Sequence, residues 1–184
     1  MVRHRLLFLS LFHLLPSLLA DYRLFLVVDH PSTLAYAYEI LPSEEVGGPW
    51  PMDSLQLEMV LADPPKACEP LATSYAYDRV VLLIERGDCT FQDKVWNAEK
   101  AGAMFALITD PKVSSDRENA LYSMMAEIKE FRVATIPAGY LAGGAGRRLR
   151  DYLQSSLDTI TVTLPVNASR VQYLPPGPPW LVWA

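Results

Sequence analysis

The residues with the most obvious chemistry in this 184-residue chain are its two cysteines, Cys68 and Cys89. A pair of thiols can form a disulfide, bind a metal or supply a nucleophile, and the last two roles require a histidine or other ligands nearby. Beyond the predicted leader described below, the only histidine is His30, in the turn-like sequence Asp29-His30-Pro31. No Gly-x-Ser-x-Gly, His-Glu-x-x-His or calcium-loop pattern is present. The sequence therefore predicts no metal site, no cofactor and no catalytic site, although two of its 21 acidic residues could still meet as a carboxylate pair.

The N-terminus indicates the compartment in which these thiols fold. Two arginines precede the apolar run 6–15, and a small residue stands at Ala20, which is the pattern of a secretory signal peptide over residues 1–20. The alternative, an uncleaved membrane anchor, is disfavoured because the run is shorter than the ~20 apolar residues that cross a bilayer. No later stretch could span a membrane, so we expect a secreted product. Because an even pair of cysteines is usually bridged in this oxidising route, we predict a disulfide between Cys68 and Cys89.

Charge and one short motif add to this picture. The formal net charge is -5 and the basic residues are not clustered, so nucleic acid is not expected as a partner. Asn167-Ala168-Ser169 is the one Asn-x-Ser/Thr sequence of the chain, and in a secreted protein it predicts a glycan on Asn167. The alternative for this sequence is an unmodified polar turn.

Strands are the main elements that must position these residues. Short apolar runs bounded by Pro, Gly, Ser or Asp predict strands at 22–28, 35–41, 55–61, 79–85, 104–108, 135–141 and 159–166. The run 79–85 is continuously apolar at its centre, which is typical of a central strand covered on both faces.

Helices are predicted at two places. Phe91, Val95 and Ala98 recur on one helical face between Thr90, a suitable N-cap, and Gly102, a suitable end. This helix and the strands beside it predict a right-handed βαβ unit. A second helix is expected to open at the glycine-rich run 143–146, and the stretch 121–131 predicts a loop with a short helix.

The residues around the second cysteine carry a family resemblance. The run Leu-Ile-Glu-Arg-Gly-Asp-Cys-Thr-Phe at 83–91, followed by Lys94-Val95, Ala98 and Ala101-Gly102-Ala103, resembles the core motif of the protease-associated (PA) domain family. Residues upstream at 67–71 and downstream at Ile136-Pro137, Gly146, Leu149 and Leu153 extend the likeness over 67–153. The resemblance implies a β-rich α/β fold. We expect a single PA-type domain at 21–174, with a mixed sheet or open barrel, a βαβ unit and two or three flanking helices, and a Pro/Trp-rich tail at 175–184.

The resemblance also implies a function without catalysis. PA domains typically accompany peptidases or form the luminal parts of sorting receptors and membrane ubiquitin ligases, where they bind proteins or regulate access to substrates. We therefore expect a secreted glycoprotein that binds an unidentified extracellular or luminal protein or peptide. One alternative is an accessory or inhibitory subunit of a secretory-pathway protease, and another is a secreted hydrolase that uses a carboxylate pair.

Three stretches are candidates for contact with a partner. They are the polar loop 112–119 with Lys112, Asp116 and Arg117, the glycine run with Gly143 and Gly144, and the tail with Trp180 and Trp183. The glycine run lacks the Walker A pattern, so it predicts a flexible, exposed loop rather than a phosphate site. The two tryptophans could either contact a partner or pack on their own domain.

Overall fold

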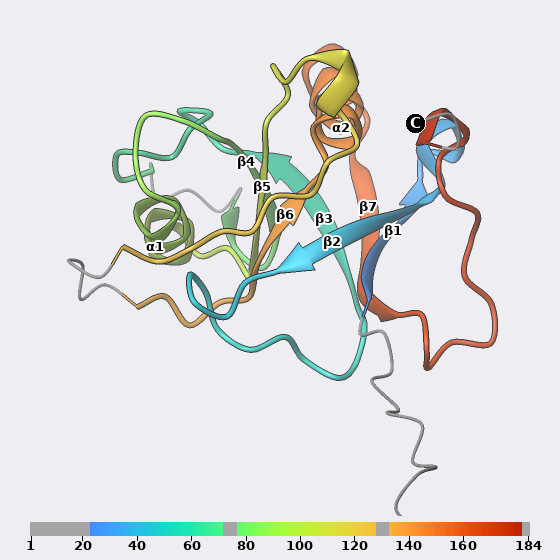
Figure 1. Ribbon diagram of the computed structural model, residues 1–184, viewed down its shortest axis with the longest axis horizontal. Helices are drawn as coiled ribbons and strands as arrows, with labels where there is room; N and C mark the ends of the chain where they lie inside the picture. Colours follow the sequence, from blue (N-terminus) through green and yellow to red (C-terminus); the bar gives the residue numbers. More distant parts are fainter. Residues whose placement is uncertain (1–22, 72–76, 128–132, 182–184) are drawn as a thin grey trace, which may run out of the picture.

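The computed structural model of the chain describes residues 23–71, 77–127 and 133–181, so the predicted signal peptide and Trp183 lie outside the described residues. The described strands close into a barrel in the order β1-β2-β6-β5-β4-β3-β7 (Figure 1). The strands are β1 (Leu24–His30), β2 (Ala37–Pro42), β3 (Leu55–Leu61), β4 (Val81–Glu85), β5 (Phe105–Thr109), β6 (Ala138–Leu141) and β7 (Ile160–Asn167). The α-helices are α1 (Phe91–Ala101) and α2 (Gly143–Ser155), and short 3₁₀ helices lie at Ser32–Leu34, Ser115–Arg117 and Pro179–Leu181.

The barrel has a parallel half and an antiparallel half. β3, β4, β5 and β6 pair in parallel, whereas β1 pairs antiparallel with β2 and β7, and the remaining β2–β6 and β3–β7 pairs are also antiparallel. The predicted β-rich α/β fold and its βαβ unit, β4-α1-β5, are confirmed. The sheet goes beyond the open barrel that we expected, because β7 pairs with both β1 and β3 and so joins its two ends.

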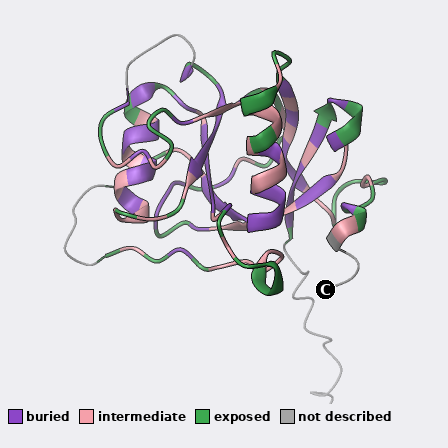
Figure 2. Ribbon diagram, turned by 90° about the horizontal axis from the view of Figure 1, so that it is seen from above, coloured by how far each residue is buried: buried purple, intermediate pink, exposed green. Residues whose placement is uncertain are grey.

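β4 shows why its sequence is continuously apolar. Val81 and Leu83 belong to the cluster that fills the barrel, whereas Leu82 and Ile84 belong to a second cluster between the sheet and α1. Both sets are buried, as predicted for a central strand covered on both faces. Figure 2 shows the same distribution for the molecule, with buried residues along the strands and exposed residues mostly in the connections.

The two helices cover different parts of the barrel. α1 begins at Thr90, whose side chain accepts a hydrogen bond from the Asp93 amide at 3.0 Å, and ends at Gly102, whose φ of 106° suits glycine. Both predicted caps are therefore confirmed. α2 contributes Ala145 and Leu149 to the cluster inside the barrel. In Figure 1 it lies over one end of the strands, so it closes that end of the barrel.

One local expectation was wrong, and a second was not met in the residues that the structure describes. The glycine run 143–146 is not an exposed loop but the buried first turn of α2. A Cβ on Gly146 would lie 2.0 Å from Oγ1 of Thr109, and one on Gly143 would lie 2.3 Å from the carbonyl oxygen of Asp110, so close packing explains these glycines. The short helix expected within 121–131 is absent from 121–127, the part of that stretch that the structure describes.

Candidate functional site

Three hollows lie around the ends of the parallel strands, and each is named here by one feature. The arginine hollow, about 460 Å³, lies between the turn 86–91 and the segment 123–127. The ion-pair pocket, about 240 Å³, lies between β3, β4 and α2 and contains Glu85 and Arg150. The disulfide groove, about 410 Å³, adjoins that pocket, since Pro65 and Glu85 line both. Ligands of parallel sheets commonly bind outside the carboxyl ends of the strands, which is where these hollows lie.

The predicted disulfide between Cys68 and Cys89 is confirmed. Cys68 lines the disulfide groove and Cys89 lines the arginine hollow, so the bridge stands between the two. Gly87, two residues before Cys89, has a φ of 110°, a conformation that glycine adopts readily and that lets the chain turn after β4. In the chain-entropy description a bridge over a loop of this length stabilises the fold by about 3 kcal/mol.

A buried lysine holds the two chain segments that the disulfide joins. Lys94 of α1 is fully buried, and its Nζ donates hydrogen bonds to the carbonyl oxygens of Lys66 at 2.6 Å and Gly87 at 2.7 Å. The same nitrogen lies 3.6 Å from Sγ of Cys68. Burial lowers the Lys94 pKa to about 8. Sequence reasoning placed Lys94 in the family motif but assigned it no role, although its position three residues after Phe91 puts it on the buried face of the helix.

Arg86 is the exposed charge of the arginine hollow. Its guanidinium carbon lies 5.9 Å from the ring centroid of Phe91 and 5.2 Å from that of Tyr122, so both rings are within cation–π distance of it. Among the described residues Arg86 forms no ion pair. The ring of Tyr122 packs edge-on against Tyr140, and burial raises the Tyr140 pKa, partly offset by Arg86. The guanidinium thus lies against two aromatic rings and carries a charge that no ion pair among the described residues neutralises.

The opposite wall of the arginine hollow is also fixed. The Glu127 amide donates to Oε1 of Gln92 at 2.8 Å, and Oγ of Ser43 donates to the Met124 carbonyl oxygen at 2.8 Å. Met125 is 71% exposed beside these anchors and gives the wall an apolar contact surface. The hollow can therefore receive an extended chain that offers an apolar side chain and a carboxylate.

The residues predicted to contact a partner are not brought together. Lys112, Asp116 and Arg117 are exposed, but only Lys112 lines a hollow, the disulfide groove. Gly143 and Gly144 are buried within α2, so they do not form the exposed loop that we expected, and their contact with a partner stays a prediction. The residues that form the arginine hollow were not singled out, because nothing local in the sequence indicates that 121–127 returns to the turn at Arg86.

The tail tryptophan and the predicted glycosylation site lie away from these hollows. The Trp180 ring packs edge-on against Tyr36 at 5.2 Å, and the guanidinium of Arg148 lies 4.1 Å from its centroid. This favours packing on its own domain over partner contact for Trp180. Asn167 ends β7, and its Oδ1 accepts hydrogen bonds from the amide and hydroxyl of Ser169.

The described residues offer neither a metal-binding cluster nor a membrane-spanning helix. No group of three or more His, Cys, Asp or Glu side chains that could hold a metal occurs among the described residues. Within the same residues, no helix combines the length and the apolar character needed to cross a bilayer. The pKa of Asp88 is lowered by its hydrogen bond with Lys66, and that of Asp116 is lowered by its hydrogen bond with Ser114. Both shifts are opposite to the raised pKa that an acid catalyst needs.

Known proteins are similar to this chain in sequence and in fold. Residues 55–149 match the family model described as the PA domain. A PRADC1-like protein of Drosophila melanogaster is 34% identical over 164 residues, which cover 86% of this chain and 82% of that protein. Vacuolar-sorting receptor 1 of Pisum sativum is 33% identical over 105 residues, and signal peptide peptidase-like 2 of Arabidopsis thaliana is 37% identical over 102 residues. These matches cover 16% and 17% of the two larger proteins. The structure of BSAP, a zinc aminopeptidase from Bacillus subtilis, shares the fold over 77% of this chain and 29% of its own, with a TM-score of 0.56 and 18% identity.

Proposed function

The chain belongs to the PA domain family, and from that premise we propose that it is a secreted, non-catalytic glycoprotein that binds a polypeptide partner through the arginine hollow. The observation that carries the proposal is the guanidinium of Arg86, which is exposed, held by two aromatic rings and without an ion pair among the described residues.

The chemistry of Arg86 favours a carboxylate as the group that it binds. A guanidinium forms paired, charge-assisted hydrogen bonds with a carboxylate, and these are stronger than bonds between neutral groups. Because Phe91 and Tyr122 already hold the side chain, binding costs less rotamer entropy than it would for a free arginine. The N-terminal end of α1 lies at the same hollow, through Thr90 and Phe91, and its dipole also favours a negative group.

The other residues that line the arginine hollow indicate which kind of partner side chain lies beside the bound carboxylate. Phe91 and Met125 offer apolar surface, and the flexible thioether of methionine adapts to side chains of different shape. Glu127 lines the hollow as well and repels a second acid. The partner segment is therefore an extended peptide that places one acidic group next to an apolar residue. The names of two relatives, a vacuolar-sorting receptor and a signal peptide peptidase-like protein, support a role with polypeptides in the secretory pathway.

The test uses a short blocked peptide, acetyl-Ala-Leu-Asp-Ala-amide, and its asparagine counterpart, titrated against the isotope-labelled protein by NMR. We expect the aspartate peptide to shift amide signals in 86–91 and 123–127, and Arg86→Gln to weaken its binding about tenfold, the equivalent of one charge-assisted hydrogen bond. Arg170→Gln, which changes an exposed arginine outside the hollow, is the matched control. Equal binding of both peptides, or an Arg86→Gln variant that binds as the original protein does, would refute the proposal.

Secretion and glycosylation are part of the same proposal. The disulfide between Cys68 and Cys89 and the relationship to the PRADC1-like protein support passage through the secretory pathway. Asn167 stands at the end of a strand with the exposed Ser169 beside it, an arrangement that supports modification of Asn167. Expression in cultured animal cells, with a mass measurement before and after glycosidase treatment, tests both. Retention in the cells, or an original protein that loses no more mass on glycosidase treatment than Asn167→Gln does, counts against them.

An accessory role toward a protease is the second candidate. It is favoured by the match to signal peptide peptidase-like 2, in which the shared segment forms part of a protein with that name. Adding the purified protein to secretory-pathway proteases and measuring their turnover tests it. A change in turnover that Arg86→Gln abolishes would support the accessory role, and unchanged turnover of every protease tested would count against it.

A further inference from the structure

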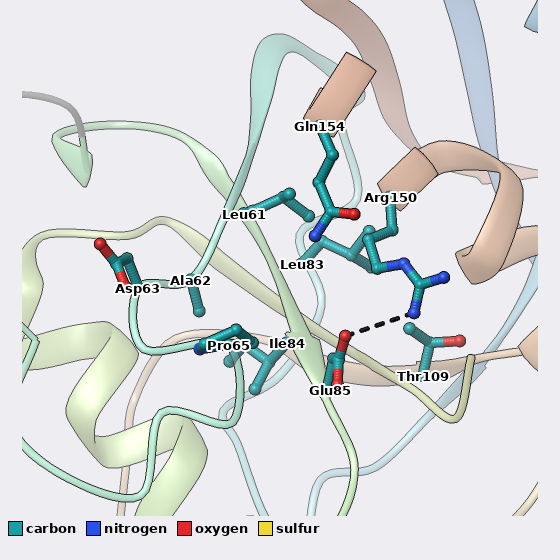
Figure 3. A pocket seen from close by; sticks show the side chains of 10 residues that line it. All are labelled: Leu61, Ala62, Asp63, Pro65, Leu83, Ile84, Glu85, Thr109, Arg150 and Gln154. Carbon is teal, nitrogen blue, oxygen red and sulfur yellow. Dashed lines mark hydrogen bonds and ion pairs between the residues drawn. The ribbon is translucent and has the colours of Figure 1, made fainter. Parts of the chain in front are cut away.

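The ion-pair pocket lies on the opposite side of β4 from the arginine hollow. Glu85 and Arg86 are consecutive, so their side chains point to opposite faces as β4 ends. Arg86 lies on the α1 side, whereas Glu85 lies toward α2, where Arg150 projects over the strand ends (Figure 3). The two hollows therefore face different surroundings although adjacent residues line them.

The floor of the pocket is apolar and its ends are charged. Figure 3 shows Ala62, Pro65 and Ile84 between the two acids Asp63 and Glu85, whereas Leu61 and Leu83 lie nearer Gln154 and Arg150. The volume of about 240 Å³ is several times the ~30 Å³ that one water occupies in the liquid, so it accommodates one long side chain. A side chain with an apolar stem and a polar tip matches such a lining.

The charges at the pocket favour a cation. The guanidinium of Arg150 makes its closer contacts outside the pocket, with Oδ1 of Asp151 at 2.6 Å and 2.9 Å, and lies 3.4 Å from Oε1 of Glu85. Asp63 forms no ion pair among the described residues. The pocket lining thus holds two carboxylates, Asp63 and Glu85, and one guanidinium, so its net charge is negative. Lys66, which lines the adjoining groove, is already paired with Asp88.

Glu85 is placed to bind that cation. Its side chain is 16% exposed, so its charge is only partly screened by water. A carboxylate has two oxygens, and the contact with Arg150 occupies one of them. Gln154 of α2 lies over the same space (Figure 3), and its amide has no hydrogen-bond partner among the described residues. It can bond the backbone of an incoming chain.

We propose that the ion-pair pocket binds one lysine or arginine side chain of a polypeptide partner, with its aliphatic stem on Leu61 and Leu83 and its cationic head at Glu85. The inference does not depend on Arg86 or on the acidic group proposed for the arginine hollow. If both hold, the partner offers groups of opposite charge to the two sides of β4.

The experiment is an NMR titration of the isotope-labelled full chain with acetyl-Ala-Lys-Ala-amide. Two matched probes replace the lysine with norleucine, which keeps the stem and loses the charge, or with glutamate. We expect the lysine peptide to shift amide signals of Leu61, Leu83 and Gln154 and to bind about tenfold more tightly than the norleucine peptide. The preference is expected to shrink as salt is added, because the contact is partly exposed.

Variants make the test specific. Glu85→Gln is expected to remove the preference for lysine over norleucine, with its fold checked by thermal unfolding. Asp63→Asn alters an exposed side chain and is expected to reduce the lysine affinity about threefold without affecting the fold. Asp53→Asn, an exposed acid outside the pocket, is the control. Arg86→Gln is expected to leave lysine binding unchanged, which separates this inference from the proposed function.

Several outcomes would overturn the inference. Equal binding of the lysine and norleucine peptides would show an apolar site without charge selection. Tighter binding of the glutamate peptide would show that Arg150, not Glu85, sets the preference. Signal changes confined to the neighbourhood of Glu127 would place the lysine in the arginine hollow instead, and no change with any probe would leave the pocket without this ligand.

Discussion

The two helices pack on the same barrel by different means. α1 buries polar side chains along its length, and each bonds the backbone of a loop: Gln92 accepts from Glu127, Lys94 donates to Lys66 and Gly87, and Asn97 donates to Ala67. α2 buries its glycine-rich first turn, and Arg147, which bonds the carbonyl oxygens of Pro111 and Val113, is only partly buried. α1 therefore positions the loops that form the hollows, whereas α2 closes the barrel by close contact.

The difference shows two ways of holding a helix against a sheet. Buried polar groups are tolerated only when they are hydrogen-bonded, so the contacts of α1 specify where each loop lies. The glycine contacts of α2 specify how near the helix lies, and the loop bonds of this helix, from the Gly144 amide to Glu118 and from Arg147 to Pro111 and Val113, hold a segment outside the arginine hollow. Changes around α1 should therefore affect the hollows as well as stability, and changes in α2 should affect stability first.

The largest expected effect is at the disulfide beside α1. Cys68→Ser with Cys89→Ser should lower the free energy of unfolding by about 3 kcal/mol, because the denatured chain loses its cross-link. The double variant should also bind the aspartate peptide more weakly at the arginine hollow, since Cys89 lines that hollow. Urea denaturation and the NMR titration measure the two effects. Loss of stability with fully retained binding would show that Lys94 alone keeps the turn in place.

The second largest loss of stability is expected for a change at Gly146 of α2. Gly146→Val should destabilise the fold by roughly 1–3 kcal/mol, because the new side chain meets Thr109. At temperatures where the variant is folded, its binding of the aspartate peptide should match that of the original protein. If binding falls as it does for the double cysteine variant, the separate roles of the two helices would be contradicted.

Lys94 gives a pH-dependent effect of intermediate size. Its folded pKa, about 8, is below the ordinary value of 10.5, so between these values the unfolded chain binds more protons and this residue's contribution to stability rises with pH. Between about pH 7.5 and about pH 9.5 this rise should be roughly 1–2 kcal/mol. Lys94→Met should lack that rise. Urea denaturation of both proteins at the two pH values measures the difference, and equal pH slopes would contradict the assignment.

The smallest effect is at the start of α1. Thr90→Ala removes the side chain that accepts from the Asp93 amide and should cost about 1 kcal/mol. α2 begins at Ala142 without a side-chain cap, so an alanine is already tolerated at the corresponding place. Thermal unfolding compares Thr90→Ala with the original protein, and an unchanged midpoint would show that the disulfide alone fixes the start of α1.

The sequence predicted those structural features that depend on residues close together in the chain. The apolar runs located the strands, and Thr90 and Gly102 marked the limits of α1, because these depend on neighbours within a few residues. The position of Arg86 between Phe91 and Tyr122 could not be found in this way, since Tyr122 is distant along the chain. The burial of Gly146 against Thr109 was missed for the same reason, because glycine also occurs in exposed loops.

The closing of the barrel has a consequence for how partners attach. Every described strand has a neighbour on both sides, so no strand offers a free row of amide and carbonyl groups along its length. Free edges invite another chain to add as an extra strand, which is a common route both to peptide capture and to aggregation. Here the barrel itself offers no such edge, so a partner must be selected by the side chains of the hollows and loops. The same closure leaves the described strands without an edge at which two copies of the chain could associate.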